Sequence, residues 1–215
     1  PLDFLYPHER QNRNSGYNDL NRAGSHRFSR DALELRMFET NGSKKFIFIL
    51  VHLKSPLDPE NIDPQGRDRR QAEFETLLKI YSELKTEQPA TPIILCGDFN
   101  GVLSPTPDAE FVNIKVAPDL RCALDLVPID PIQRFTHMQF TPMTTISNNR
   151  QIDYILLPQE LHPNLVKSRT QVFRFTDEFG MPLLLPKTLT EKRQLPSDHY
   201  PVVVTLEFNE PKDIK

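Results

Sequence analysis

The chain has 215 residues, of which 26 are Lys or Arg and 29 are Asp or Glu, so its net charge is -3. This length predicts a sizeable core, and the near-balanced charge argues against a broadly basic protein that coats nucleic acid. No apolar run reaches the roughly 18 residues of a membrane span, and residues 1–30 lack the apolar stretch of a signal peptide. We therefore expect a soluble monomer, cytoplasmic or secreted after loss of a signal, whose compartment the sequence does not specify.

Five short runs predict β-strands. Four are apolar at nearly every position, as strands covered on both faces are: Phe46–Leu53, Ile93–Cys96, Ile152–Leu156 and Val202–Leu206. The run Leu33–Phe38 alternates more between apolar and polar residues. It would pair with the run at 46–53 through the turn at 40–43, in which Asn41-Gly42 is a strong hairpin signal.

The spacing of apolar residues predicts one clear helix, Arg67–Lys85. Asp68 would cap its first turn, and Arg70 and Glu73 would lie mostly away from its apolar face. A weaker pattern predicts a second helix at Pro118–Leu126. Strands and helices are therefore mixed along the chain.

Stretches rich in Pro, Asn and Thr predict loops, at 54–66, 101–116, 129–150 and 176–197. The last of them contains the apolar segment Met181–Pro186. We expect this segment to pack on the body of the protein, the alternative being a hairpin that faces a membrane or a substrate.

Polar residues occur at or near the ends of the apolar strands, where a plain core strand would avoid them. Neighbouring strands lie about 4.8 Å apart, so polar side chains at matched strand ends can converge on one site. The residues concerned are His52, Asp98, Asn100, Asp153, Asp198 and His199. They predict a functional site at one edge of a sheet.

The residue types indicate phosphate chemistry, although each also has a plain structural reading. Asp98 is a hard oxygen ligand for Mg²⁺ or a partner for water, but Gly97–Asn100 alone could be a strand exit. A His199 oriented by Asp153 would be a general acid or base, whereas a lone His is usually structural. Lys54, beside His52, offers a cation for a phosphate oxygen.

Five motifs together resemble the endonuclease/exonuclease/phosphatase superfamily. They are FSRDALELRMF (28–38), VHLKSP (51–56), ILCGDFNG (94–101), RQIDYIL (150–156) and SDHYPVVVTL (197–206). Their order and spacing match the family over most of the chain. The resemblance implies a deoxyribonuclease I-like fold, an α/β (α+β) four-layer sandwich of two packed, mainly antiparallel β-sheets flanked by helices.

The resemblance also implies roles for individual residues. Asp98 would position or deprotonate the attacking water, and Asn100 would bind the scissile phosphate. His199, oriented by Asp153, would act as a base or stabilise the pentacovalent phosphorane. His52 would be the acid for the leaving oxygen.

Further roles concern the metal and the substrate phosphate. Asp198, together with Asp98, would reach the metal, expected to be Mg²⁺, with Mn²⁺ or Ca²⁺ as alternatives. Arg30 matches an Arg that relatives place near the substrate phosphate, and Asn148 or Asn149 falls where relatives have polar phosphate contacts.

The N-terminal part departs from the family pattern. Relatives begin with a strand ending in Asn and then a strand ending in the Glu that binds the catalytic Mg²⁺. Here Glu9 lies in a polar stretch with no apolar strand before it. We therefore expect a single domain, 1–215, that lacks its N-terminal strands, with the principal metal-binding Glu upstream of residue 1.

Three functions remain open. The preferred one is a metal-dependent nuclease, endonuclease or exonuclease, that cleaves DNA or RNA by in-line attack of an activated water. The second is a phosphatase or sphingomyelinase-type phospholipase of the same superfamily, acting on a phosphorylated small molecule or lipid. The third is a non-catalytic remnant that binds a partner through the old site, which the missing Glu would favour.

Overall fold

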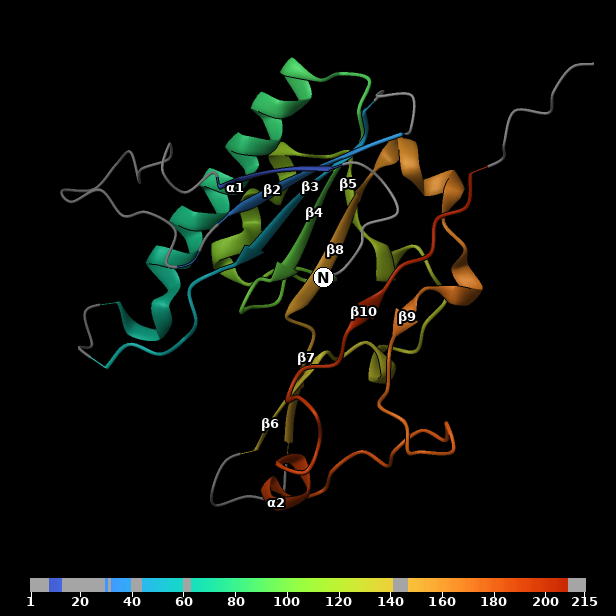
Figure 1. Ribbon diagram of the computed structural model, residues 1–215. Coiled ribbons are helices and arrows are strands. Elements are labelled where there is room, and N and C mark those ends of the chain that lie inside the picture. Colours follow the sequence, from blue (N-terminus) through green and yellow to red (C-terminus); the bar gives the residue numbers. More distant parts are fainter. Residues whose placement is uncertain are drawn as a thin grey trace, which may run out of the picture.

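The structure is a computed structural model that describes residues 8–12, 30, 32–39, 44–59, 63–140 and 147–208. A six-stranded sheet in the order β1-β2-β3-β4-β8-β5 runs through its centre (Figure 1). Strands β3 and β4 run parallel, and the other neighbours run antiparallel. The strands are β1 (His8–Asn12), β2 (Leu33–Phe38), β3 (Lys44–His52), β4 (Ile93–Asp98), β5 (Leu120–Cys122) and β8 (Asp153–Pro158).

Two smaller sheets accompany the main sheet. One joins β6 (His137–Phe140) to β7 (Ser147–Arg150), and the other joins β9 (Gln171–Val172) to β10 (Val202–Val203). The α-helices are α1 (Arg67–Glu87) and α2 (Leu189–Lys192). Short 3₁₀ helices are η2 (Pro64–Gly66), η3 (Ala109–Val116), η4 (Ala123–Asp125), η5 (Pro131–Gln133), η6 (Gln159–Asn164) and η7 (Lys167–Arg169).

Most of the predicted elements are confirmed. The strands predicted at Leu33–Phe38, Phe46–Leu53, Ile93–Cys96 and Ile152–Leu156 correspond to β2, β3, β4 and β8, and the long helix corresponds to α1. The turn expected at 40–43 lies outside the described residues, but β2 and β3 do pair antiparallel. The mixed α/β class with a mainly antiparallel sheet is therefore confirmed.

Other predictions are wrong. The helix expected at Pro118–Leu126 is the strand β5 followed by η4, because Leu120 and Cys122 alternate inward against β8. The central strand expected at Val202–Leu206 is reduced to the two residues of β10 and a single bridge between Leu206 and Leu165. The predicted loops at 54–66, 101–116, 129–150 and 176–197 contain η2, η3, the β6–β7 pair and α2. The polar stretch around Glu9, in which the sequence analysis identified no strand, contains β1, which pairs with β2; that the domain lacks the N-terminal strands of its relatives stays a prediction.

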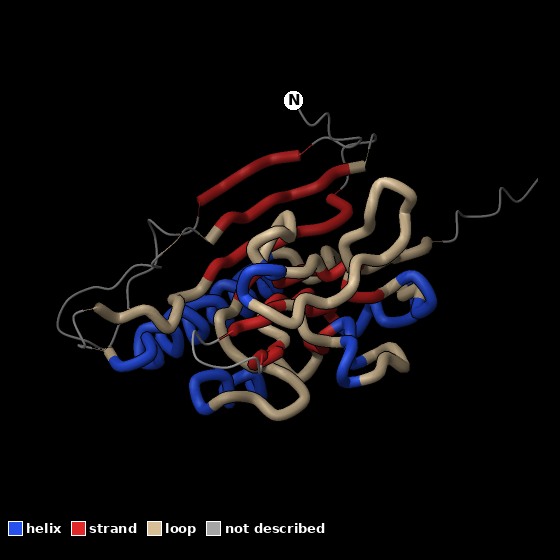
Figure 2. The backbone as a smooth tube through the Cα atoms, turned by 90° about the horizontal axis from the view of Figure 1, so that it is seen from below, coloured by secondary structure: helices blue, strands red, loops and turns tan. Residues whose placement is uncertain are grey.

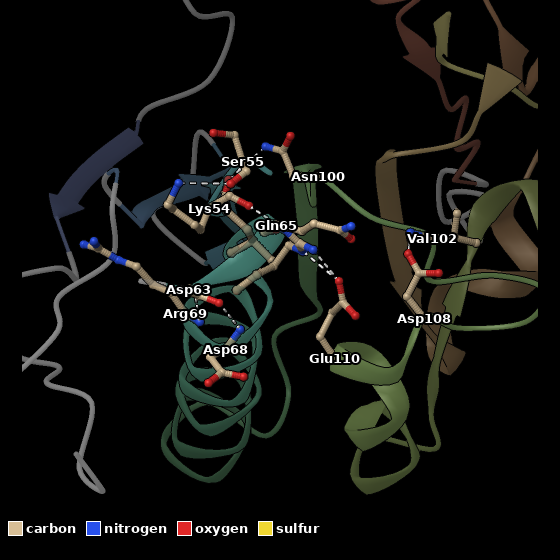
Figure 3. Close-up of polar contacts among 12 residues, drawn as sticks. Lys54, Ser55, Asp63, Gln65, Asp68, Arg69, Asn100, Val102, Asp108 and Glu110 are labelled. Atoms are coloured by element: carbon tan, nitrogen blue, oxygen red, sulfur yellow. Dashed lines mark hydrogen bonds and ion pairs between the residues drawn. The ribbon is translucent and has the colours of Figure 1, made fainter. Parts of the chain in front are cut away.

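The first turn of α1 is capped differently from the prediction. The residue before the helix is Gly66, in the left-handed region, and Asp68 lies inside the first turn. The capping side chain is that of Asp63, whose carboxylate accepts the backbone N–H groups of Asp68 at 3.0 Å and Arg69 at 2.9 Å (Figure 3). Asp63 lies five residues before Asp68, so the intervening η2 turn brings it into range.

Arg70 and Glu73 of α1 are buried, contrary to the prediction that they lie mostly away from the packed face. The Nε of Arg70 donates to Oε1 of Glu110 at 3.0 Å, and its Nη1 donates to the carbonyl of Lys54 at 2.9 Å. Glu73 accepts the backbone N–H of Lys54 at 2.6 Å. Two charged residues of the helix therefore hold the loop that follows β3.

The core lies between α1 and the main sheet, whose strands lie side by side in Figure 2. Its centre is aromatic: Phe74 of α1 packs edge-on against Phe111 and Phe99, and Phe99 packs against Tyr154 of β8. Phe99 directly follows Asp98, so the buried rings anchor the end of β4. Among the helices in the described ranges, none is both long and apolar enough to cross a membrane.

The apolar segment Met181–Pro186 packs on the body only at its end, where Pro186 is buried, so the expectation is wrong for most of the segment. Leu184 is 90% exposed and Met181 63%, and Phe179 just before the segment is 81% exposed. The segment closes on itself: Asp177 N–H donates to the Met181 carbonyl at 2.9 Å, and the Asp177 carboxylate accepts the N–H groups of Phe179 and Met181. Because these backbone groups are satisfied locally, the hairpin keeps its shape with its apolar side chains in solvent.

Candidate active site

Three adjacent strands place one ionisable residue each at the same level of the sheet. His52 is the register partner of Asp98 across the parallel pair β3–β4, and Asp98 is the register partner of Asp153 across β4–β8. Nε2 of His52 lies 3.2 Å from Oδ2 of Asp98. Nδ1 of His199 lies 2.9 Å from Oδ2 of Asp153. The four side chains form a continuous line across the sheet edge and are hereafter called the catalytic row, after the role proposed for them below.

A glycine permits this arrangement on β4. Gly97 has φ +134°, and a Cβ added to it would lie 1.9 Å from the carbonyl oxygen of Val51. A residue with a side chain at this position would push β3 away from β4 just before His52 and Asp98.

Asp153 and His199 are positioned by a buried hydroxyl. Oγ1 of Thr136 accepts the backbone N–H groups of Ile152 and Asp153, each at 3.0 Å. The carbonyl of Thr136 accepts the N–H of Tyr200 at 2.7 Å, which ties the SDH segment to the start of β8. Thr136 therefore fixes both members of the Asp153–His199 pair, although the sequence analysis did not single it out.

The carbonyl of Leu53, just beyond β3, gathers two further predicted residues. Nδ2 of Asn100 donates to it at 2.9 Å, and Nη1 of Arg30 donates to it at 3.3 Å. Asn100 adopts φ +54°, and its backbone N–H donates to Oδ1 of Asp98 at 2.7 Å. The amide of Asn100 and the guanidinium of Arg30 each have more N–H donors than the one used here, so both can also donate to a substrate oxygen.

The row contains groups with opposed pKa shifts. Burial, and then the neighbouring Asp153 charge, raises the pKa of Asp98 to about 6. Burial, followed by the charges of Arg30 and His199, lowers the pKa of His52. The hydrogen bond to Asp153 raises the pKa of His199, against the opposing effect of burial. The site thus offers a carboxylate that titrates near neutral pH and an imidazole that favours its charged form.

A second group of polar residues adjoins His199. His137 bridges His199 through the backbone, and the two rings lie 4.8 Å apart. Nε2 of His137 is 3.7 Å from Oδ2 of Asp198, and Nζ of Lys192 is 3.6 Å from the same oxygen. The sequence analysis missed His137 and Lys192, because β6 and α2, which carry them, lie in stretches predicted as loops and come together only in the folded chain.

The pKa values in this second group are shifted by burial and by the local charges. Burial, and then the charges of His199 and Lys192, lowers the pKa of His137. Burial raises the pKa of Asp198, but Lys192, His199 and His137 outweigh it, so the net shift is downward. Asp198 is therefore a stable carboxylate flanked by cationic or neutral nitrogen groups.

Two sets of side chains could hold a metal ion among the described residues. One set is Asp98, Asp153 and His199, and the other is His137, Asp198 and His199; within each, one ligand atom per residue lies within 4.8 Å of the others. The sequence analysis grouped Asp98 with Asp198, whereas the structure places them in different sets that share His199. A pocket of about 400 Å³ lies beside the row and is lined in part by Asp98, Asp153 and His199.

The remaining predicted residues lie less close to the row. The ammonium of Lys54 donates to the carbonyls of Ser55, at 3.0 Å, and Leu57, so it closes its own loop (Figure 3). Asn148 and Asn149 are exposed on β7, next to Arg150, which pairs with His137. Their phosphate-binding roles, and the metal-binding Glu expected upstream, stay predictions.

No protein-family model matches the sequence, and no curated protein sequence matches it. Solved structures do match. Truncated Caenorhabditis elegans TDP2 aligns with a TM-score of 0.52 at 17% identity, over 89% of this chain and 62% of that one. D. rerio TDP2 complexed with a single-strand DNA product aligns with a TM-score of 0.52 at 15% identity, over 89% and 64%.

The chain shares the fold of these TDP2 structures, the deoxyribonuclease I-like fold that the sequence predicts. The predicted fold is thereby confirmed. At these identities the likeness concerns the fold, and the chain spans less than two thirds of the length of either TDP2 chain. The function of the site therefore depends on its own residues.

Proposed function

We propose that the chain is a metal-dependent phosphodiester hydrolase that cleaves nucleic acid. The observation that carries this proposal is the catalytic row, in which two carboxylates and two imidazoles lie side by side at one sheet edge. The fold shared with TDP2, one of whose structures holds a single-strand DNA product, supports nucleic acid as the substrate class.

In the proposed mechanism, Asp98 accepts a proton from the attacking water. Although its pKa is raised to about 6, it is still ionised at neutral pH, which is the state that a proton acceptor requires. His52, with its lowered pKa, is neutral there and holds the Asp98 carboxylate through Nε2. This differs from the acid role that the resemblance implies for His52, because a group with a lowered pKa is rarely protonated at neutral pH.

His199 has a different role from Asp98, which is to stabilise the charge that develops on the phosphate. Asp153 orients its ring and favours the imidazolium, which stabilises negative charge on the pentacovalent phosphorane. Asn100 and Arg30, which converge on the Leu53 carbonyl, donate hydrogen bonds to the non-bridging oxygens of the scissile phosphate. The leaving oxygen takes its proton from solvent water. Proton acceptance from the attacking water and stabilisation of the phosphorane charge are thus assigned to different residues.

The donor set fits a hard divalent cation. Asp98 and Asp153 are register partners, and the Asp153 charge contributes to the raised pKa of Asp98, so a cation between them would relieve a real repulsion. Mg²⁺ prefers such carboxylate oxygens together with substrate phosphates, and Mn²⁺ or Ca²⁺ can take similar ligands. When bound, the cation supplies positive charge that neutralises the phosphate. Asp98 and Asp153 would hold it, rather than the pair Asp98 and Asp198.

One observation favours phospholipid as a second candidate substrate. The exposed hairpin that contains Phe179, Met181 and Leu184 follows directly after Phe175, which lines the pocket beside the row. Apolar side chains at the mouth of a phosphodiesterase site would suit a substrate presented in a lipid surface.

The test is a substrate panel. The purified chain with Mg²⁺ is given plasmid DNA, single-stranded DNA and RNA, sphingomyelin vesicles and a phosphate monoester. Chelator and His199→Gln serve as negative controls, and His162→Gln, on η6 outside both metal groups, controls for the substitution itself. We expect cleavage of nucleic acid that chelator and His199→Gln abolish and His162→Gln retains. Cleavage of sphingomyelin alone would favour the second candidate, and no cleavage of any diester by the folded chain would overturn the proposal.

A further inference from the structure

The group beside the catalytic row has a different chemistry from the row itself. It offers two imidazoles and one carboxylate, from His137, His199 and Asp198, whereas the row is centred on two carboxylates. Nitrogen-rich sets of this kind suit Zn²⁺, whereas oxygen-rich sets suit Mg²⁺. The two sets therefore select different metals while sharing His199.

The three side chains lie slightly farther apart than the ligands of a bound zinc ion. Ligand atoms around tetrahedral zinc lie about 3.3–3.5 Å apart, as bond lengths of about 2.0–2.2 Å require. Nε2 of His137 lies 3.7 Å from Oδ2 of Asp198, and one ligand atom from each of the three residues lies within 4.8 Å of the others. The set therefore needs only small side-chain movements to close on an ion, and the 3.7 Å contact is too long for a hydrogen bond that would oppose them.

The surroundings of His199 also match those of a zinc ligand. A metal-binding histidine usually donates its other ring N–H to a carboxylate, which fixes its tautomer. Here Nδ1 of His199 is 2.9 Å from Asp153, which leaves Nε2 as the metal-binding nitrogen. The backbone bridge between His137 and His199 sets their rings side by side, and Asp198, with its side chain 59% exposed, provides access from solvent.

We propose that His137, Asp198 and His199 form a zinc site that inhibits the hydrolysis proposed above. An ion bound there would occupy Nε2 of His199, the atom that otherwise faces the phosphorane. The zinc site itself stands on the geometry of the three side chains, and its inhibitory effect rests on the proposed function. His137 has no part in the proposed hydrolysis, so its role here is separable from it.

Lys192 provides an internal competitor for the ion. Its ammonium lies 3.6 Å from the same Asp198 oxygen, so an incoming dication must displace this charge from the carboxylate. Removing the ammonium should therefore strengthen zinc binding, in the direction opposite to removal of His137.

Binding is measured first by calorimetric titration of the whole chain with Zn²⁺, and by the visible absorption of Co²⁺, which is strong in tetrahedral sites. We expect one ion per chain at this site, His137→Gln weakening binding by roughly tenfold or more, and His162→Gln leaving it unchanged. Lys192→Met should tighten binding several-fold and provides the test if circular dichroism shows that His137→Gln is unfolded. Equal affinity in the wild type, His137→Gln and Lys192→Met, or no binding by the wild type, would overturn the zinc site.

Inhibition is measured separately, as the Zn²⁺ concentration that halves Mg²⁺-dependent cleavage of the substrate found in the panel. His137→Gln should keep the basal rate and raise this concentration by roughly the factor by which binding weakens. Zinc that binds at the site but inhibits the wild type and His137→Gln equally would overturn the inhibitory role. A chain that binds zinc at this site and cleaves no diester would contradict the proposed function and leave the zinc site standing.

Discussion

Replacing Gly97 by alanine tests how the sheet assembles the catalytic row. The added Cβ would lie 1.9 Å from the carbonyl oxygen of Val51 and 2.9 Å from its carbonyl carbon. Even close carbon–oxygen contacts are about 3.3 Å long, so β3 and β4 would have to separate by more than about 1 Å. This parallel pair carries His52 and Asp98 at its end, and the strain would fall directly on the row.

The expected cost has two parts. A non-glycine residue in a sparsely populated backbone region costs of order 1–3 kcal/mol, and overpacking against fixed neighbours typically costs about 1–3 kcal/mol. We therefore expect Gly97→Ala to lower the free energy of unfolding by about 2–6 kcal/mol. Gly180→Ala is the matched control, because Gly180 also has a positive φ, +78°, but an added Cβ there meets nothing within 4 Å.

The assay is urea-induced unfolding of the wild type and both variants, followed by circular dichroism and compared at equal m-values. Gly180→Ala should carry only the backbone cost, about 1–2 kcal/mol. If Gly97→Ala is no less stable than Gly180→Ala, close approach of the Val51 carbonyl does not constrain this position, and the reasoning fails.

Three further predictions concern residues around the row. Arg70→Met leaves the carboxylate of Glu110 buried without its partner and should lower the free energy of unfolding in urea by about 3–5 kcal/mol. The double variant Arg70→Met with Glu110→Leu should regain part of this stability. Equal losses of stability in the single and double variants would contradict the importance of the pair. Thr136→Val removes the acceptor of the N–H groups of Ile152 and Asp153, and thermal unfolding should show a loss of stability of about 1–3 kcal/mol for each group. Thr136→Ser, which keeps the hydroxyl, should be about as stable as the wild type. Similar losses of stability in the two variants would refute the role of the hydroxyl. The pKa of Asp98 is raised from 3.8 to about 6, so the folded chain binds this proton more tightly than the unfolded chain. The free energy of unfolding of the wild type should therefore fall as the pH rises from 3.8 to about 6, and Asp98→Asn should lack this fall. If the stability curves of the two proteins run parallel over this pH range, the raised pKa of Asp98 is contradicted.

The catalytic row was predictable because it depends on strand ends. His52, Asp98 and Asp153 each lie at or beside the boundary of an apolar run, and apolar runs are the strongest signal of a sheet in this sequence. Once β3, β4 and β8 are adjacent, their pairing places His52 opposite Asp98 and Asp98 opposite Asp153. His199 was predicted from its place just before the apolar run at 202–206, although only two residues of that run form β10.

Other features depend on contacts that no local pattern carries. His137 reaches His199 through a bridge between segments 62 positions apart in the numbering, and its own run, FTHMQF, lies in a stretch predicted to be a loop. The helical pattern placed Arg70 off the packed face, yet it is buried because Glu110, 40 residues away, supplies a carboxylate. Lys54 has the right charge for a phosphate contact, but its ammonium meets nearby loop carbonyls instead.

The measurement that tests the central claim most directly is Mg²⁺-dependent cleavage of a phosphodiester in ¹⁸O-labelled water, by the wild type and by Asp98→Asn. The account predicts that the label enters the phosphate product and that Asp98→Asn, still folded, is slower by on the order of a hundredfold or more. Cleavage by Asp98→Asn at the wild-type rate, or product phosphate without label, would contradict the assignment of this row to hydrolysis.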